Sequence, residues 1–156
     1  GYIQAFSGPM ISKRDSSEKI YLCIKYSNIT INSMSGNFDK SIIDKVWSKG
    51  IIVKGYDEAL FRKDCCGAWI VKNEYGKNSA FGWEVDHVYP QIKGGSNDLV
   101  NLRPMHWENN RSKSDDYPNY DSAICAEDNR NVKKVGHFFV NEELQATLSQ
   151  LYNIKS

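Results

Sequence analysis

The pattern of hydrophobic and polar residues predicts that the first part of the chain forms both strands and a helix. Residues 19–34, KIYLCIKYSNITINSM, are rich in Ile, Tyr and Thr with partial alternation, which predicts two strands joined by a turn. Residues 38–49 carry apolar side chains on one helical face. We therefore expect a helix there, capped by Asn37 or Asp39 and ending before Gly50.

Three further patterned segments follow in the middle of the chain. Residues 66–71, CGAWIV, form a short apolar run typical of a buried strand. Residues 81–88, FGWEVDHV, have the residue types of a strand, and residues 101–103 predict a short extended piece. After Pro104, which is allowed at a helix start, residues 105–114 have a helical composition. The local order is therefore strand, loop, strand, helix.

The last part of the chain predicts an irregular stretch, a strand and a helix. Residues 114–134 are polar and rich in Asp and Asn, so we expect them to be irregular. Residues 135–140, VGHFFV, predict a strand, and Asn141 predicts the cap of a C-terminal helix. Strands and helices in this mixture predict an α+β fold with a single core.

Length and composition fit one globular domain over residues 1–156. The chain is 40% hydrophobic and 25% charged, which is ordinary for a soluble protein, and no apolar run is long enough to cross a bilayer. A protein that binds nucleic acid mainly by neutralising phosphate charge is usually more basic than this chain, whose net charge is +1. A nucleic-acid partner would therefore need a local basic patch and a bound cation.

The four cysteines form no Cys-x-x-Cys pair, so we expect no structural zinc ion. Neighbouring cysteines such as Cys65 and Cys66 rarely pair with each other. We expect reduced, mostly buried thiols, which favours a cytoplasmic location. A secreted or injected protein stays an open alternative.

Residues 84–113, EVDHVYPQIKGGSNDLVNLRPMHWENNRSK, hold two of the three histidines and four asparagines. Asparagine does not titrate, so this density suggests a use as a neutral oxygen ligand. In a regular strand adjacent side chains point to opposite faces. Asp86 and His87 can therefore serve one site only if the strand ends there and the backbone turns. The Gly94-Gly95 pair supplies the flexibility for such a loop.

The predicted helix would bring a carboxamide next to this strand end. His106 and Asn110 are four residues apart and share one helix face, and Lys113 lies on roughly the same side. Asp86 and Asn110 can then converge, and one carboxylate with one carboxamide suits Mg²⁺. His87 beside such an ion is placed to take a proton from water, which is the chemistry of phosphodiester hydrolysis.

This segment resembles the HNH nuclease motif of the ββα-metal superfamily, in the variant whose last histidine is replaced by asparagine. Asn101 lies fourteen residues after His87, and Asn110 lies nine residues after Asn101, spacings similar to those of the family. The elements that carry the resemblance are, in chain order, Asp86-His87, Gly94-Gly95, Asn101-Leu102, Asn110 and Lys113.

The resemblance implies a role for each residue at the centre of the motif. His87 would be the general base, and Asp86 and Asn110 would hold one divalent ion, Mg²⁺ or another such as Mn²⁺. Asn101 would pin the loop and orient His87 without touching the substrate. The products would carry 5′-phosphate and 3′-hydroxyl ends.

The resemblance also implies phosphate contacts by Lys113, Arg111 and Arg103. His106 stands where relatives that bind structural zinc often have Cys. It is open whether His106 contacts phosphate or serves as a supplementary ligand, and we favour the phosphate contact. The matching region is residues 60–115, and it implies a single domain built around a ββα-metal motif. Residues 1–55 would be an N-terminal extension and residues 116–156 a C-terminal one.

Several neighbouring residues have ordinary structural interpretations. His137 in an apolar strand predicts a structural histidine, and Trp83 and Trp107 predict packing beneath the motif. Glu84 is either a further carboxylate near the ion or is turned away by strand alternation. Asn97 predicts turn chemistry.

Three functions remain in competition. The first is a metal-dependent HNH endonuclease, acting on DNA in preference to RNA, although the motif contacts neither a base nor a 2′-hydroxyl. The second is a catalytically inactive nucleic-acid-binding module, which would have no need for the intact His87. The third is a nuclease toxin that is neutralised by an immunity protein and uses the same chemistry.

Overall fold

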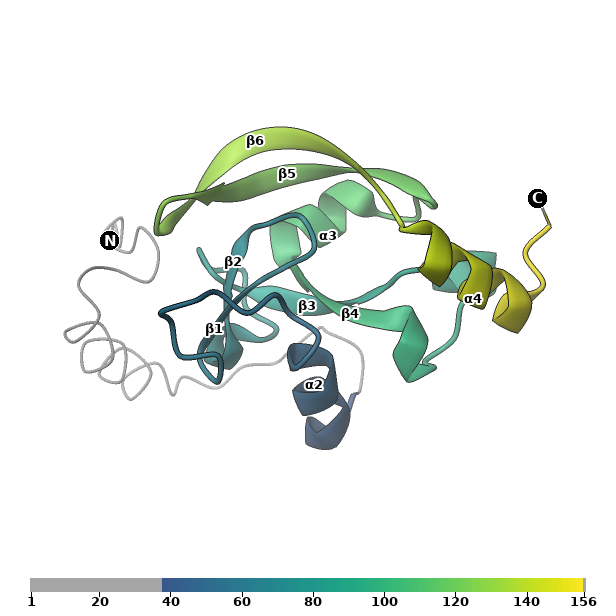
Figure 1. Ribbon diagram of the computed structural model, residues 1–156, viewed down its shortest axis with the longest axis horizontal. Helices are drawn as coiled ribbons and strands as arrows, with labels where there is room; N and C mark the ends of the chain where they lie inside the picture. The colour runs from purple at the N-terminus through teal and green to yellow at the C-terminus, as the bar shows by residue number, and fades with distance from the viewer. Residues whose placement is uncertain (1–37, 156) are drawn as a thin grey trace.

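The computed structural model describes residues 38–155, which form helices and three antiparallel strand pairs (Figure 1). The helices are α2 (Lys40–Trp47), α3 (Trp107–Lys113) and α4 (Glu142–Tyr152). The strands are β1 (Phe61–Lys63), β2 (Trp69–Val71), β3 (Trp83–His87), β4 (Leu102–His106), β5 (Asn119–Glu127) and β6 (Arg130–Phe139). The predicted α+β class is confirmed. The strands predicted for residues 19–34 lie outside the described residues.

The β3–β4 hairpin lies between α2 on one side and α3 on the other (Figure 1). On the α2 side, Trp83 and Leu102 of the hairpin are buried together with Val46 and Trp47 of α2. Met105 belongs to a different buried cluster, which also contains residues of β5 and α4. Side chains alternate between the two faces of a strand, so Glu84, Asp86 and Arg103 lie on the same face as Met105, which is the face toward α3.

Helix α2 is the predicted helix of residues 38–49, shortened at both ends. Asp39 caps it as predicted, because its carboxylate accepts a hydrogen bond from the backbone N–H of Ile42 at 3.0 Å. The alternative cap, Asn37, lies outside the described residues. Gly50 follows the helix and donates its backbone N–H to the Trp47 carbonyl oxygen.

The expectation that residues 114–134 are irregular is wrong. Most of this stretch belongs to β5 and β6, a long two-stranded ribbon that arches over α3 (Figure 1). Tyr120, Ser122 and Ile124 are buried, and the residues between them are more exposed. The polar composition therefore concealed an alternation with a period of two. Asp128, with a φ of 53°, lies in the turn between the strands.

Strand β6 contains residues 135–139 of the strand predicted for residues 135–140, but it begins earlier, at Arg130, and ends at Phe139. The interpretation of His137 as a packed structural histidine is wrong. Its side chain is 84% exposed, and its Nδ1 lies 2.6 Å from a carboxylate oxygen of Asp121 on β5. Within residues 38–155 the face of the β5–β6 ribbon that carries His137 is uncovered, so an apolar sequence there does not imply burial.

Two strand boundaries also differ from the prediction. Residues 66–71 form a strand only from Trp69, because the buried Asp64 carboxylate accepts hydrogen bonds from the backbone N–H groups of Cys66 and Ala68. These hydrogen bonds hold residues 64–68, which precede β2, in a turn. Strand β4 runs through Pro104, and α3 begins only at Trp107. A two-stranded hairpin tolerates proline, since its outward N–H groups have no strand to pair with.

The C-terminal helix forms as predicted. The Asn141 carboxamide oxygen accepts a hydrogen bond from the backbone N–H of Leu144 at 2.8 Å, and Leu148 of α4 is fully buried. Trp83 is fully buried as predicted, and Trp107 donates its indole N–H to the Ser79 carbonyl oxygen. No helix within residues 38–155 combines the length and the apolar character needed to span a bilayer.

Candidate functional site

The predicted site residues lie at the end of β3, in the loop that follows, on β4 and on α3. Asp86 points toward α3, where its carboxylate contacts Lys113. His87 is the last residue of β3, and its ring lies on the α2 side, with its centroid 6.1 Å from that of Phe38. Strand β3 stays regular through His87, so Asp86 and His87 point to opposite faces. The structure thus places them on two sides of one strand end.

Asp86 is buried and contacts two cations. One carboxylate oxygen accepts a hydrogen bond from Arg103 Nε at 2.8 Å, and the other lies 3.2 Å from Lys113 Nζ. Lys113 is fully buried and also donates to the His87 carbonyl oxygen at 3.0 Å. Buried charges of this kind are stable only when they are paired and hydrogen-bonded. The expected contact of Lys113 with phosphate is therefore not available in this structure.

Arg103 is also engaged inside the protein instead of reaching toward a substrate. Its guanidinium carbon lies 5.0 Å from the centre of the Tyr120 ring, and the Tyr120 hydroxyl donates to Cys65 Sγ at 3.6 Å. Arg103 Nη2 is buried and has no hydrogen-bond partner within the described part of the chain. A hydrogen bond from Cys66 and the nearby charge of Arg103 lower the pKa of the Cys65 thiol. The expected phosphate contact of Arg103 is replaced by these internal contacts.

Glu84 and Asn110 form the second polar contact between the hairpin and α3. Asn110 Nδ2 donates to a Glu84 carboxylate oxygen at 2.8 Å. Glu84 therefore points toward the helix, which was left open by the sequence. Asp86 is two residues further along β3 and points to the same side, so two carboxylates and one carboxamide share this face. No hydrogen bond joins Asp86 directly to Asn110 among residues 38–155.

His87 is oriented by a residue that the sequence did not identify as part of the site. Its Nε2 lies 2.7 Å from the carboxamide oxygen of Asn97. A carboxamide oxygen only accepts hydrogen bonds, so in the neutral ring Nε2 carries the proton and Nδ1 keeps its lone pair. Nδ1 is then the atom that can take a proton from water. Asn97 was assigned to turn chemistry, and nothing in its local sequence distinguishes it from other loop asparagines.

Asn101 closes the loop between β3 and β4. It is fully buried, and its carboxamide oxygen accepts from the backbone N–H of Tyr89 at 2.7 Å. Its Nδ2 donates to the carbonyl oxygens of Tyr89 and Ser96, both at 3.0 Å. The side chain thus joins the two ends of the loop, which is the contact pattern that the resemblance implied for it.

The glycine pair allows this loop to close. Gly94 has a φ of 108°, a conformation that side chains disfavour. A Cβ atom on Gly95 would lie 1.8 Å from the Tyr89 carbonyl oxygen and 3.0 Å from Asn101 Nδ2. Gly94 is therefore needed for its backbone conformation, and Gly95 is needed because the Tyr89 carbonyl group approaches it closely.

Replacing Asn101 with alanine is expected to destabilise the protein by about 1–3 kcal/mol, because it leaves buried backbone groups without partners. The loop should also become more mobile. The check is urea denaturation together with hydrogen exchange of the amides of residues 89–101. Asn73→Ala, at an exposed asparagine, is the control and should change neither measurement. An Asn101→Ala protein with wild-type stability and exchange would contradict the closing role.

The expected phosphate contact of His106 is not present, because the residue is buried. Its Nε2 donates to the Ala80 carbonyl oxygen at 2.9 Å, and its Nδ1 accepts from the backbone N–H of Glu108 at 3.1 Å, which caps α3. Burial lowers the pKa of His106 below its ordinary value of 6.5. His106 is therefore a neutral structural residue at the start of the helix.

This lowered pKa predicts a pH dependence of stability. The unfolded chain takes up a proton on His106 at a higher pH than the folded protein does. Its contribution to the free energy of unfolding is therefore complete above about pH 6.5 and falls as the pH drops through the lower folded pKa. Denaturation measured between pH 7 and about pH 5 should show this loss. His106→Asn, which keeps a capping acceptor, should flatten the pH dependence; an unchanged slope would contradict the assignment.

Arg111 is the exposed member of the four predicted phosphate contacts. Its guanidinium carbon lies 4.7 Å from the centre of the Trp107 ring, and its Nη2 donates to the Asn78 carboxamide oxygen at 3.1 Å. Stacking on an aromatic ring holds a guanidinium in place while leaving other donors free. Arg111 is thus available to a phosphate on the surface of α3.

Asn109 fixes α3 in position, a role that the sequence did not predict. Its Nδ2 donates to the buried Asp64 carboxylate at 3.0 Å, and its oxygen accepts from the backbone N–H groups of Ala123 and Ile124 on β5. Burial raises the pKa of Asp64, and its hydrogen bonds act in the opposite direction. Asp64 also accepts from the backbone N–H of His106 at the end of β4, so Asn109 and Asp64 together join three hairpins around the helix.

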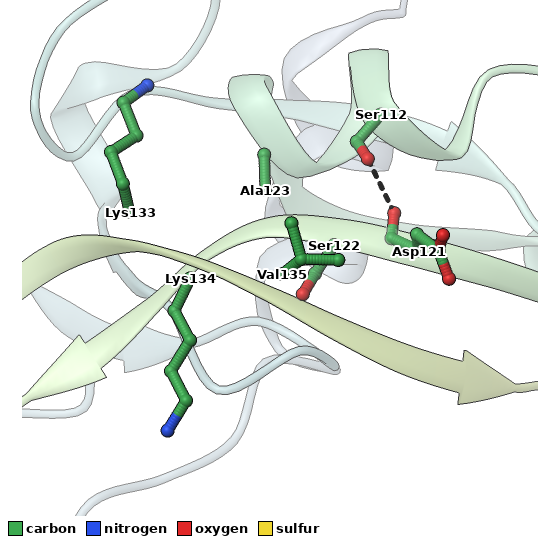
Figure 2. Close-up of a pocket in the computed structure, with 7 residues that line it drawn as sticks. All are labelled: Ser112, Asp121, Ser122, Ala123, Lys133, Lys134 and Val135. Atoms are coloured by element: carbon green, nitrogen blue, oxygen red, sulfur yellow. Dashed lines mark hydrogen bonds between the residues drawn. The ribbon is translucent and has the colours of Figure 1, made fainter.

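A shallow pocket of about 430 Å³ lies between the ribbon and the end of α3, away from His87 and Asp86. Figure 2 shows its lining, with the Ser112 hydroxyl donating to the Asp121 carbonyl oxygen at 2.7 Å. The side chains of Lys133 and Lys134 extend in different directions in Figure 2, so they do not converge on one ligand position.

A comparison of the chain with models of known families, with curated proteins and with solved structures finds no match.

Proposed function

We propose that this protein is a metal-dependent endonuclease of the HNH type, which hydrolyses phosphodiester bonds in DNA. The observation that carries the proposal is the setting of His87 at the end of β3. Asn97 holds its Nε2, its Nδ1 is left as a proton acceptor, and Asn101 closes the loop that presents Asn97. This setting favours a general base over a solvated surface histidine.

In the proposed reaction His87 Nδ1 takes a proton from a water molecule, and the resulting hydroxide attacks the phosphorus atom. The bond from phosphorus to the 3′ oxygen breaks, which leaves a 5′-phosphate and a 3′-hydroxyl end once the 3′ oxygen has taken a proton from solvent. Arg111 on the surface of α3 is the proposed phosphate contact. A phosphate contact of this kind does not distinguish DNA from RNA, so DNA is a preference that binding measurements must test.

The proposed ligands of one divalent ion are Asp86 and Asn110, with Glu84 as a further carboxylate on the same face. These are hard oxygen donors, which suit Mg²⁺ or Mn²⁺. No group of three His, Cys, Asp or Glu side chains in the described range 38–155 is arranged to hold a metal ion, so water and phosphate would complete the coordination. When bound, the ion neutralises charge on the scissile phosphate and stabilises the leaving oxygen. The Lys113 ammonium beside Asp86 must move to admit it, and the end of β3 must turn so that Asp86 and His87, which lie on opposite faces of the strand, serve one site.

The ion pairs of Asp86 support one alternative, a module that binds nucleic acid and does not cleave it. A carboxylate that is already neutralised by Arg103 and Lys113 has little need for a third cation. The alternative leaves the orientation of His87 by Asn97 without a purpose, and for this reason we favour the nuclease.

The two proposals are separated by incubating supercoiled plasmid with the protein and Mg²⁺, with and without EDTA. The nuclease proposal predicts nicked plasmid that disappears when EDTA is present. Fluorescence anisotropy of a labelled duplex gives binding in the same conditions. Binding without nicking under Mg²⁺ or Mn²⁺ would favour the inactive module.

Asn110→Ala is expected to weaken the binding of Mn²⁺ by at least roughly tenfold, because it removes a neutral oxygen ligand from the proposed set. Stability should change little, since Asn110 is half-buried and, among the described residues, its side chain forms one hydrogen bond, to Glu84. Calorimetric titration with Mn²⁺ is the measurement, and Asn73→Ala is the control. An unchanged titration would remove Asn110 from the ligand set.

A further inference from the structure

The loop that orients His87 has little support of its own. Between residues 91 and 100 every residue except Gly95 is exposed. Yet Asn97, near the middle of this loop, must hold its carboxamide within 2.7 Å of His87 Nε2. Asn101 holds the inner side of the loop through the Ser96 carbonyl oxygen. The outer side needs a second support if Asn97 is to stay in place.

That support comes from α4, far away in the sequence. The Tyr152 hydroxyl donates to a carboxylate oxygen of Asp98 at 3.0 Å and lies 3.1 Å from the Ser96 hydroxyl. Ser96 and Asp98 flank Asn97 on both sides. Hydrogen bonds from Ser96 and Tyr152 also lower the pKa of the Asp98 carboxyl group, which keeps it an ionised acceptor at neutral pH.

Helix α4 is itself well anchored, so it can act as a rigid support. Leu148 is fully buried in the same cluster as Val88, the residue that follows β3. The Tyr152 ring stacks on the Tyr89 ring with their centroids 5.6 Å apart. Tyr152 therefore has a fixed ring and a hydroxyl directed at the loop.

We propose that Tyr152 is a positioning residue for the nuclease reaction, whose hydroxyl holds the Ser96–Asp98 segment and thereby keeps the Asn97 carboxamide on His87. The inference rests on the proposed function, and it gives the C-terminal helix, which lies beyond the HNH-like segment, a role in that function. Tyr152 touches neither substrate nor metal in this role and acts only through the loop.

Tyr152→Phe tests the proposal, because it removes the hydroxyl and keeps the ring on Tyr89. The amide of Asn101, which donates to the Asp98 carbonyl oxygen at 2.8 Å, should exchange with solvent roughly tenfold faster, since the segment loses its hydrogen bonds to Tyr152. The kcat for cleavage of a duplex should fall roughly tenfold, while KM stays unchanged, because substrate binding does not involve the hydroxyl. Tyr56→Phe, in the cluster around Trp69, is the matched control and should alter neither measurement.

A double-mutant comparison separates positioning from a general loss of stability. In an Asn97→Ala protein the hydroxyl has nothing left to position, so adding Tyr152→Phe should not lower kcat further. Two independent, multiplying losses would overturn the proposal, as would a Tyr152→Phe protein with wild-type kcat.

Failure of the proposed function is recognised separately. If the wild-type protein does not cleave DNA, the nuclease proposal fails. Hydrogen exchange of the loop amides then tests separately whether the Tyr152 hydroxyl holds the loop in place. Faster exchange in Tyr152→Phe supports that contact without any activity, and unchanged exchange overturns it.

Discussion

His87→Ala is expected to lower the rate of DNA cleavage by roughly 10²–10⁴-fold, the usual contribution of a general base. The reason is that Nδ1 of His87 is the proposed proton acceptor, with Nε2 held by Asn97. The measurement is the single-turnover rate on an end-labelled duplex with saturating Mg²⁺. Binding of the duplex should be largely unchanged, because the imidazole takes a proton and does not hold the phosphate.

The control for this prediction is His137→Ala. His137 lies on the exposed face of the ribbon, paired with Asp121, and should not affect cleavage. A His87→Ala protein that cuts at a rate close to that of the wild type would show that the base has been misassigned. Loss of cleavage in both variants would point to a general effect on the protein.

The second large effect is on stability. Asp86→Ala is expected to lower the free energy of unfolding by about 3–5 kcal/mol, because it leaves the buried cations of Arg103 and Lys113 without their shared partner. Urea denaturation is the measurement. Adding Lys113→Met should restore part of the loss, since it removes one of the two uncompensated charges.

A surface ion pair provides the comparison for this effect. Asp44 and Lys72 are 3.2 Å apart, but their side chains are 42% and 35% exposed. Asp44→Ala should therefore cost less than about 1 kcal/mol. If Asp86→Ala cost no more than Asp44→Ala, the ion-pair cluster would not be the structural element described here. The size of the stability effect also explains why Asn110 gives a cleaner test of metal binding than Asp86.

The N-terminal caps of α2 and α4 and the strand–loop–strand–helix order of residues 81–114 were predictable because their signals are local. Asp39 and Asn141 each lie one residue before a helix, and each side-chain oxygen accepts a hydrogen bond from a backbone N–H of the first turn, which requires no knowledge of the rest of the fold. The strand–loop–strand–helix order followed from the period of the pattern and from the two glycines. The role of Asn101 in pinning the loop was an expectation from the resemblance and not from the local pattern.

Burial was not predictable from the same signals. Lys113 is in a helical, polar segment that suggests exposure, and only the position of Asp86 on the facing strand makes its burial stable. His106 is also buried, and its burial is stabilised by a hydrogen bond to the carbonyl oxygen of Ala80. The ribbon of β5 and β6 was missed because its polar residues alternate with the few that are buried, and short windows average over the two.

The orientation of His87 depends on contacts that are distant in sequence. Ser96 and Tyr152 are separated by 56 positions, and no local pattern connects them. The sequence marks Asn97 only as one of several loop asparagines. Its role becomes visible when β3, the loop and α4 are in place together.

Hydrolysis of a phosphodiester bond by attack of water leaves ends of a defined chemistry, so the ends at the nick distinguish it from other strand breaks. Supercoiled plasmid is incubated with the protein and Mg²⁺, and the nicked product is then treated with DNA ligase. We expect nicks that depend on the ion and that the ligase seals, because the ends are 5′-phosphate and 3′-hydroxyl. Plasmid that stays intact with every divalent ion, or nicks that form in EDTA or cannot be sealed, would contradict the proposed hydrolysis.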